Sequence, residues 1–388
     1  MRTGIANFTL DTGKCPRWLF ERMVALGRPM IEIIVEEFGP EEFIKRLADP
    51  VWFQSLGTVL AFDWNASGLT TVLCGALRQA VAGREKDLGI FVCGGKGRAS
   101  RKTPEEIKNW SWQTGLNQIA SDNLVYNSKM VAKVDSALVQ DGYQLYHHSF
   151  FFTKNGAWTV VQQGMNEDDG SARRYHWSSQ DVKELVCEPH SAISAQTVKD
   201  DVLNLVAKEG EENRGVSVDL VNESNYLSLL KDLESVDRFS TPYSKVARIK
   251  TKGEQLTLLD LKGCEFNYHP VIRENFSRSR YLKKILWQVK ERQPENYERL
   301  LSLPGVGPKT MRALALVGEV IYGAQLSFND PARYSFAHGG KDATPYPVDR
   351  PTYDKTISVI QTLRDLIMKA RIPLVEKEKM LKRLGEPF

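Results

Sequence analysis

The sequence predicts a mixed α/β N-terminal domain followed by a mostly α-helical C-terminal domain. Short apolar runs at residues 57–62 and 90–93 have the length and composition of buried strands. Between them, residues 70–81 have helical periodicity, so this part of the chain predicts a strand–loop–helix–strand unit. From about residue 216 onward the apolar spacing is chiefly helical.

A strongly charged stretch at residues 208–214 separates these two patterns, and we place the domain boundary there. The predicted domains are residues 1–215 and 216–388. The net charge of +4 and the pI near 8.6 suit a polyanionic partner without establishing one. No apolar run approaches the roughly 20 residues of a membrane span, and the N-terminus lacks a signal-peptide core, so we expect a cytoplasmic protein without membrane contact. The oligomeric state is not predicted.

Two polar loops follow the predicted strands, at the ends where open α/β sheets usually bind ligands. The first begins at Asp63. The second is rich in glycine and basic residues and includes Lys96, Arg98 and Arg101. A cationic loop of this kind predicts contact with nucleic-acid phosphates, and a solvated surface turn is the alternative.

A helix and a β-hairpin carry an unusual concentration of polar residues. The helix is expected at residues 127–139, and an Asn-Gly turn joins strands expected at 143–153 and 157–163. His147 and His148 lie next to each other in the first strand, so they point to opposite faces of the sheet. We expect Leu145, Ser149 and Phe151 on the face of His147, and Gln144, Tyr146, Phe150 and Phe152 on the face of His148.

This region could bind a divalent metal, Mg²⁺ or Mn²⁺, or position an attacking water. Asp135 and Asp141 would supply carboxylates beside the imidazole of His147, and these three are the predicted metal ligands. The full set of predicted catalytic residues is Asp63, Asp135, Asp141, His147, His148 and Gln163. The alternative is that the histidines are hydrogen-bonded strand residues without a catalytic role.

Arg173 and Arg174 are flanked by aromatic residues in the segment ARRYHW. Paired arginines with neighbouring aromatics suit phosphate contact combined with base stacking. A structural cluster of basic and aromatic side chains is an equally open interpretation.

The segment LPGVGPKT at residues 303–310 lies between two helical patterns and resembles the helix-hairpin-helix DNA-binding motif, here spanning residues 295–322. We expect Gly305 and Gly307 to adopt positive φ and to leave amides exposed at the start of the second helix. The resemblance implies that Gly305, Gly307, Lys309 and Thr310 contact backbone phosphates without reading sequence. A packed helical turn is the alternative.

A second polar loop follows the hairpin, at residues 330–342, and contains His338 and Lys341. Its density of Gly, Pro, His, Lys and Asp is typical of a functional connection. We therefore count His338 and Lys341 among the predicted DNA contacts.

Taken whole, the sequence is similar to an archaeal and bacterial family catalogued only as a domain of unknown function. The stretches that carry the resemblance are DWNASGLTT, GGKGRASRKTPEEI, KVDSALVQDGYQLYHH, VVQQGMN, ARRYHW, LPGVGPKT and SFAHGGKD, in this order. The resemblance implies that the N-terminal domain and the hairpin domain occur together.

These observations predict a nucleic-acid-processing enzyme, a metal-dependent DNA nuclease of repair or recombination that holds duplex or branched DNA with the hairpin. DNA is favoured over RNA. One alternative follows from similarity to the DNA glycosylases of the helix-hairpin-helix superfamily, which implies Lys309 as a Schiff-base amine and Asp349 as the assisting carboxylate. A non-catalytic DNA-binding protein is the other alternative.

Overall fold

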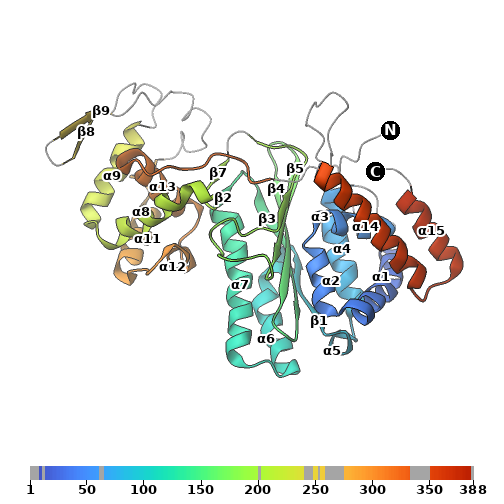
Figure 1. Cartoon of the computed structure of the whole chain (residues 1–388). Helices are drawn as coiled ribbons and strands as arrows, with labels where there is room; N and C mark the ends of the chain where they lie inside the picture. Colours follow the sequence, from blue (N-terminus) through green and yellow to red (C-terminus); the bar gives the residue numbers. More distant parts are fainter. Residues whose placement is uncertain are drawn as a thin grey trace, which may run out of the picture.

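The computed structural model describes residues 8–10, 14–60, 65–199, 202–239, 248–251, 254–257, 275–332 and 350–385. Within these residues the chain forms a central antiparallel sheet between two layers of helices, with a further group of helices beside α7 (Figure 1). The mixed α/β class predicted from the sequence is confirmed.

The helices are named here in chain order. Those of the first half are α1 (Arg17–Phe38), α2 (Pro40–Leu47), α3 (Pro50–Val59), α4 (Ala66–Val81), α5 (Glu85–Leu88), α6 (Thr103–Thr114) and α7 (Gln118–Ala137), with the 3-10 turn η1 (Gly97–Lys102). Those of the second half are α8 (Glu211–Asn222), α9 (Tyr226–Phe239), α11 (Arg280–Arg292), α12 (Tyr297–Ser302), α13 (Pro308–Tyr322), α14 (Arg350–Lys369) and α15 (Leu374–Gly385), with η2 (Lys208–Gly210).

The main sheet has five strands in the order β1-β3-β4-β5-β6 among the described residues, and every neighbouring pair is antiparallel. Its strands are β1 (Ile90–Lys96), β3 (Gln144–Thr153), β4 (Trp158–Asn166), β5 (Ser171–Ser178) and β6 (Ala192–Ser194). Short two-stranded ladders pair β2 (Val139–Gln140) with β7 (Leu203–Asn204) and β8 (Arg248–Thr251) with β9 (Glu254–Thr257). The expected Asn-Gly turn between β3 and β4 is confirmed, with Gly156 at φ 83°.

The sheet is covered on both faces, which explains why its strands carry so few exposed positions. Helices α6 and α7 cover one face of the sheet, and Phe150 and Phe152 belong to the core on that face (Figure 1). Helices α1 to α4 cover the other face, and Phe151 and Val161 belong to the core there. His147 and His148 therefore point to opposite helical layers, as predicted. A bulge between Leu145 and His147 shifts the alternation, so Tyr146 lies on the face of His147 and not on that of His148.

The prediction of a strand at residues 57–62 is wrong for residues 57–59, which are helical. Residues 50–59 form α3, whose N-terminus is capped by the Asp49 carboxylate accepting from Val51 N at 2.9 Å and Trp52 N at 3.3 Å. Nearly all of α3 is buried, and a helix that is apolar on every side lacks the 3.6-residue periodicity that distinguishes it from a strand. The described sheet is antiparallel, so the rule for open α/β sheets that suggested two ligand loops does not apply to it.

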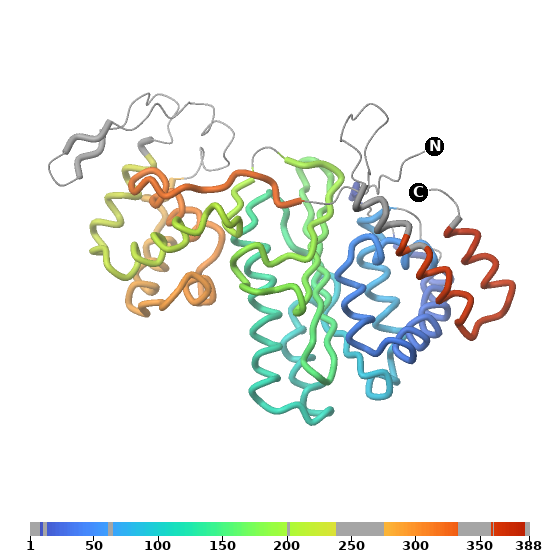
Figure 2. Tube along the Cα trace, in the orientation of Figure 1, coloured from blue at the N-terminus to red at the C-terminus, as the bar shows by residue number. Residues whose placement is uncertain are grey.

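The last two helices return to the N-terminal part of the chain. Figure 2 shows α14 and α15 beside α1 and α3, which come from the opposite end of the sequence. Leu363, Leu366 and Ile367 are buried in the same core as the α1–α4 layer. The hairpin helices instead share the core of the α7 face, so the segment predicted as one C-terminal domain divides between two cores.

Replacing Ile367 by alanine should destabilise the protein by about 2–5 kcal/mol, because the change removes a fully buried side chain from the junction of the two chain ends. Thermal or urea unfolding measures the effect. Met368→Ala is the matched control, since the adjacent Met368 is 53% exposed and should change stability little. Equal effects of the two substitutions would contradict this packing.

Candidate functional site

The turn at residues 303–307 joins α12 and α13 in a tight hairpin. Asn296 caps α12 by accepting from the Arg299 amide at 2.9 Å, and α13 starts with Pro308 at its first position. Gly305 has φ 84°, as predicted, and a side chain would be strained there. The same expectation for Gly307 is wrong, since its φ of −149° is ordinary extended backbone.

Helix α7 holds this turn in place. The Lys133 ammonium donates to the carbonyls of Leu301 and Leu303, and the Gln140 side chain donates to Pro308 O at 3.0 Å. Tyr126 adds a 2.6 Å hydrogen bond to Glu298 on α12. Burial lowers the pKa of Lys133 to about 8. These contacts fix the hairpin on a rigid helix without using the outer face of the turn.

The outer face of the turn presents backbone groups to solvent. Pro304, Gly305 and Pro308 are exposed, whereas Val306 is buried beneath the turn. Among the described residues, no hydrogen bond is made to the amides of Gly305 and Gly307. Two amides without a described partner, next to a helix N-terminus, form a position suited to an anion.

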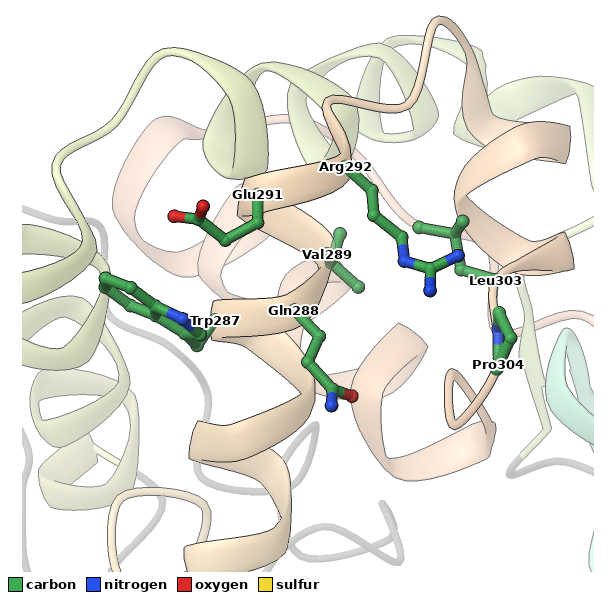
Figure 3. A pocket seen from close by; sticks show the side chains of 7 residues that line it. All are labelled: Trp287, Gln288, Val289, Glu291, Arg292, Leu303 and Pro304. Atoms are coloured by element: carbon green, nitrogen blue, oxygen red, sulfur yellow. The ribbon is translucent and has the colours of Figure 1, made fainter.

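Basic and aromatic side chains surround the turn. Helix α11 carries the exposed Lys284 and Arg292, and a cavity of about 270 Å³ lies between this helix and the turn, lined by Arg292 and also by Glu291. Figure 3 shows Arg292 extending toward Leu303 from one side of this cavity, with Trp287 farther along α11. The Lys309 ammonium lies 5.9 Å from the centre of the Phe276 ring. Thr310, another predicted phosphate contact, is only 1% exposed, so its side chain faces the core.

The glycine-rich basic loop is a separate surface feature. Lys96 ends β1 and is exposed, with its ammonium 5.7 Å from the Tyr146 ring centre, and Arg98 and Arg101 are exposed on η1. These residues follow the edge strand of the sheet, whereas the hairpin packs on α7. Their predicted contact with nucleic acid therefore concerns a different part of the molecule.

Arg173 and Arg174 lie in the interior, and neither reaches a surface where nucleic acid could bind. Both are completely buried on β5. Arg173 donates to Asp141 at 3.0 Å and to both carboxylate oxygens of Asp330 at 2.8 and 2.7 Å. Arg174 donates to His176 Nε2 at 2.8 Å on the other face of the sheet. The structural alternative, a cluster of basic and aromatic side chains, fits these positions, because β5 is an inner strand covered on both faces and both phases of its alternation are buried.

The predicted catalytic residues that the structure describes are also buried, and they belong to separate clusters. Asp135, 1% exposed, accepts from the Gln162 amide, from Trp177 Nε1 at 3.1 Å and from His190 Nε2 at 2.5 Å. Gln162 in turn contacts His148 Nδ1 at 2.7 Å. Asp135 is thus surrounded by donors.

Asp141 forms the second cluster, with Arg173, the Tyr175 hydroxyl at 2.6 Å and the Tyr143 amide at 3.1 Å. Burial raises the pKa of Asp141, while Arg173 opposes that shift. Its oxygens are therefore occupied by internal donors.

His147 and Gln163 lie on the opposite face of the sheet from Asp135. His147 Nε2 contacts Ser149 Oγ at 3.0 Å, and the Gln163 amide donates to Ser67 O at 2.9 Å and to the Tyr146 hydroxyl. The sheet thus separates His147 from Asp135, so the structure does not bring the three predicted metal ligands together. In the described parts of the chain no three His, Cys, Asp or Glu side chains form a group that could hold a metal ion. Asp63, His338, Lys341 and Asp349 lie outside the described residues.

Sequence reasoning missed His190, Trp177, Tyr175 and Asp330, which complete the two carboxylate clusters. Tyr175 and Trp177 alternate with Arg174 and His176, and this period of two could have identified β5 as a strand. No local sequence pattern identifies His190, because its contact with Asp135 joins residues 55 positions apart.

Comparison with known proteins identifies the family. The chain belongs to the family described as "Protein of unknown function (DUF763)", which it matches over residues 4–348. Neither the curated proteins nor the solved structures include a match. None of the helices in the described residues has the length and apolar character needed to cross a membrane.

Acid should destabilise the fold through its buried histidines. Burial lowers the pKa of His147 to about 3 and also lowers that of His148 and His176. Since an unfolded histidine titrates near pH 6.5, the unfolded chain takes up protons that the folded chain does not. For His147, stability is fully present above about pH 6.5 and falls by up to about 1.4 kcal/mol per pH unit down to about pH 3.

Urea unfolding of the wild type and of His147→Gln between pH 7 and pH 4 measures this loss. The variant should lose less stability per pH unit, by up to about 1.4 kcal/mol, because glutamine does not titrate. The comparison cancels contributions that both proteins share, including those of the buried carboxylates. Identical slopes would show that His147 is not held neutral in the fold.

Proposed function

We propose that this protein binds nucleic acid through a helix-hairpin-helix formed by α12, the turn at 303–307 and α13. The observation that carries the proposal is the pair of amides at Gly305 and Gly307, which have no hydrogen-bond partner among the described residues and lie at the N-terminus of a 15-residue helix. Backbone phosphate would accept from these amides and gain from the positive end of the helix dipole. Such contacts position a nucleic acid without reading its sequence.

The surroundings of the turn support an anionic partner. Arg292 of α11 lines the cavity beside the turn, and Lys309 is the second residue after the turn. Tyr281, which is 59% exposed, donates to the Gly305 carbonyl at 3.1 Å and holds an aromatic ring at the same surface. Duplex DNA fits this arrangement, since a convex turn with amides and cations can reach phosphates across a groove.

A metal-dependent nuclease, with DNA held in the same way, has weaker support from the described residues. Its carboxylates and imidazoles are hydrogen-bonded to one another inside the core, whereas a hydrolytic metal site needs clustered ligands open to substrate. A glycosylase would use Lys309, but the second residue of that proposal, Asp349, lies outside the described residues. Binding is therefore the function that the geometry supports best.

Gly307→Ala should weaken DNA binding without unfolding the protein. A Cβ at Gly307 would meet no atom within 4 Å, and its extended φ suits alanine. The methyl group would occupy the space where a phosphate approaches the amides. We expect affinity for duplex DNA to fall by about tenfold, on the order of the loss of one charge-assisted hydrogen bond. Fluorescence anisotropy with a labelled duplex measures it.

Gly215→Ala is the matched control for this experiment. Gly215 is exposed on α8, and a Cβ there also has open space around it. The control should bind DNA like the wild type, and wild-type affinity should fall steeply as salt increases. Unchanged affinity in Gly307→Ala, or the absence of salt-dependent binding by the wild type, would refute the proposal.

The Asp135→Asn variant tests whether the Asp135 carboxylate has a structural or a catalytic role. The amide NH₂ group would face buried donors, so we expect a loss of about 3–5 kcal/mol in stability. Thermal unfolding is measured beside cleavage of labelled DNA with Mg²⁺, with Mn²⁺ and with EDTA. A variant that keeps its melting temperature but loses a metal-dependent cleavage shown by the wild type would instead establish the nuclease.

A further inference from the structure

The cavity of about 270 Å³ between α11 and the hairpin turn is not used by phosphate binding at the amides of the turn. Figure 3 shows α11 forming one wall, with Leu303 and Pro304 of the turn opposite. Sites that enclose a whole small molecule run from about 300 to 1,000 Å³. This cavity is smaller, so it suits a single ring system more than a complete ligand.

The apolar part of the cavity is a preformed wall. It consists of Val289, which is buried, and of Leu303 and Pro304. The Leu303 carbonyl accepts from the Lys133 ammonium at 2.6 Å and from the Val306 amide at 3.3 Å, which holds this wall against α7. A flat aromatic ring could pack there without a rearrangement of the turn.

Two polar side chains of the cavity have no partner within the protein that the structure describes. Gln288 and Arg292 are exposed, and Figure 3 shows both on the side of α11 that faces the turn. In the described parts of the chain, neither side chain makes a hydrogen bond or an ion pair. The Gln288 amide offers donors and an acceptor, and the planar Arg292 guanidinium can stack on a ring or pair with a phosphate.

The remaining lining residues, Trp287 and Glu291, lie at the margin of the cavity. Figure 3 shows their side chains on the other side of α11, away from the turn. Trp287 packs edge-on against Tyr226 at a centroid distance of 5.2 Å. Arg292 and Glu291 are the charged residues of the lining, one of each sign, so the cavity favours a neutral ring whose attached phosphate meets Arg292.

The cavity adjoins the position proposed for a phosphate. Pro304 lines it, and the next residue, Gly305, has an amide without a described partner. In a nucleic acid, each base is joined through one sugar to the backbone phosphates on either side. A paired base faces its partner inside the duplex, whereas an unpaired base can turn outward, stack on a protein surface and present its hydrogen-bonding edge.

We propose that this cavity binds an unpaired nucleobase of the strand whose backbone the turn holds. The base would pack against Leu303 and Pro304, hydrogen-bond through its edge to Gln288, and place its phosphate near Arg292. The substrate class that follows is a duplex interrupted by unpaired nucleotides, such as a bulge or a branch point. This inference rests on the proposed function, because the turn must first hold the backbone.

Fluorescence anisotropy of the full-length protein with two labelled DNA duplexes tests the proposal. One duplex carries a central bulge of three thymidines, and the other carries the same bulge built from three abasic residues, so both have the same number of phosphates. The thymidine bulge should bind about tenfold more tightly, within the range expected for stacking of one base. Equal affinities would overturn this inference and leave backbone binding by the hairpin standing, whereas no binding to either duplex would remove both.

Gln288→Ala tests whether the base lies in this cavity. The residue is exposed, so the fold should be unchanged. Affinity for the thymidine bulge should fall about fivefold, through the loss of one hydrogen bond, while affinity for the abasic bulge stays the same. Gln113→Ala is the matched control, since Gln113 is exposed on α6 and does not line the cavity. Equal losses on both bulges, or a full thymidine preference in Gln288→Ala, would refute the assignment.

Discussion

The ion pair between Arg173 and Asp330 is the contact on which the arrangement of the two halves depends. Arg173 is completely buried on β5, and Asp330 lies just beyond α13, so the pair joins the central sheet to the segment that follows the hairpin helices. Removing one member of such a pair leaves an uncompensated charge in the interior, at a cost of about 3–5 kcal/mol. Asp141 adds a second carboxylate to the same guanidinium, which explains how a protein interior accepts these charges.

Helix α7 extends this connection along the molecule. One of its sides packs on the sheet through Val131 and Val134, while Lys133 and Tyr126 contact the hairpin. Asp135 belongs to the sheet side, where it contacts Trp177 and His190. One helix therefore holds both the hairpin turn and a buried polar cluster of the sheet.

Local patterns predicted the elements well and their burial poorly. The Asn-Gly turn, the helix at α7 and the hairpin around Gly305 were found because turn chemistry and periodicity are local properties. The strand at 57–62 failed because α3 is apolar on every side. Arg173 and Arg174 were predicted to contact phosphate, and Asp135 and Asp141 to bind a metal, because charged residues are seldom buried without such a role. Their burial depends on partners distant in the sequence, such as Asp330 and His190, which no local pattern reveals.

The same distinction explains why a dense set of polar residues need not be an active site. His148, Gln162, Asp135, Trp177 and His190 form one continuous chain of hydrogen bonds, and each contact satisfies a group that burial has removed from water. A catalytic cluster would instead leave capacity directed toward a substrate. In this chain the carboxylate, amide and ring groups face one another inside the core, so the density of polar residues around the hairpin of β3 and β4 reflects internal pairing and not a site open to substrate.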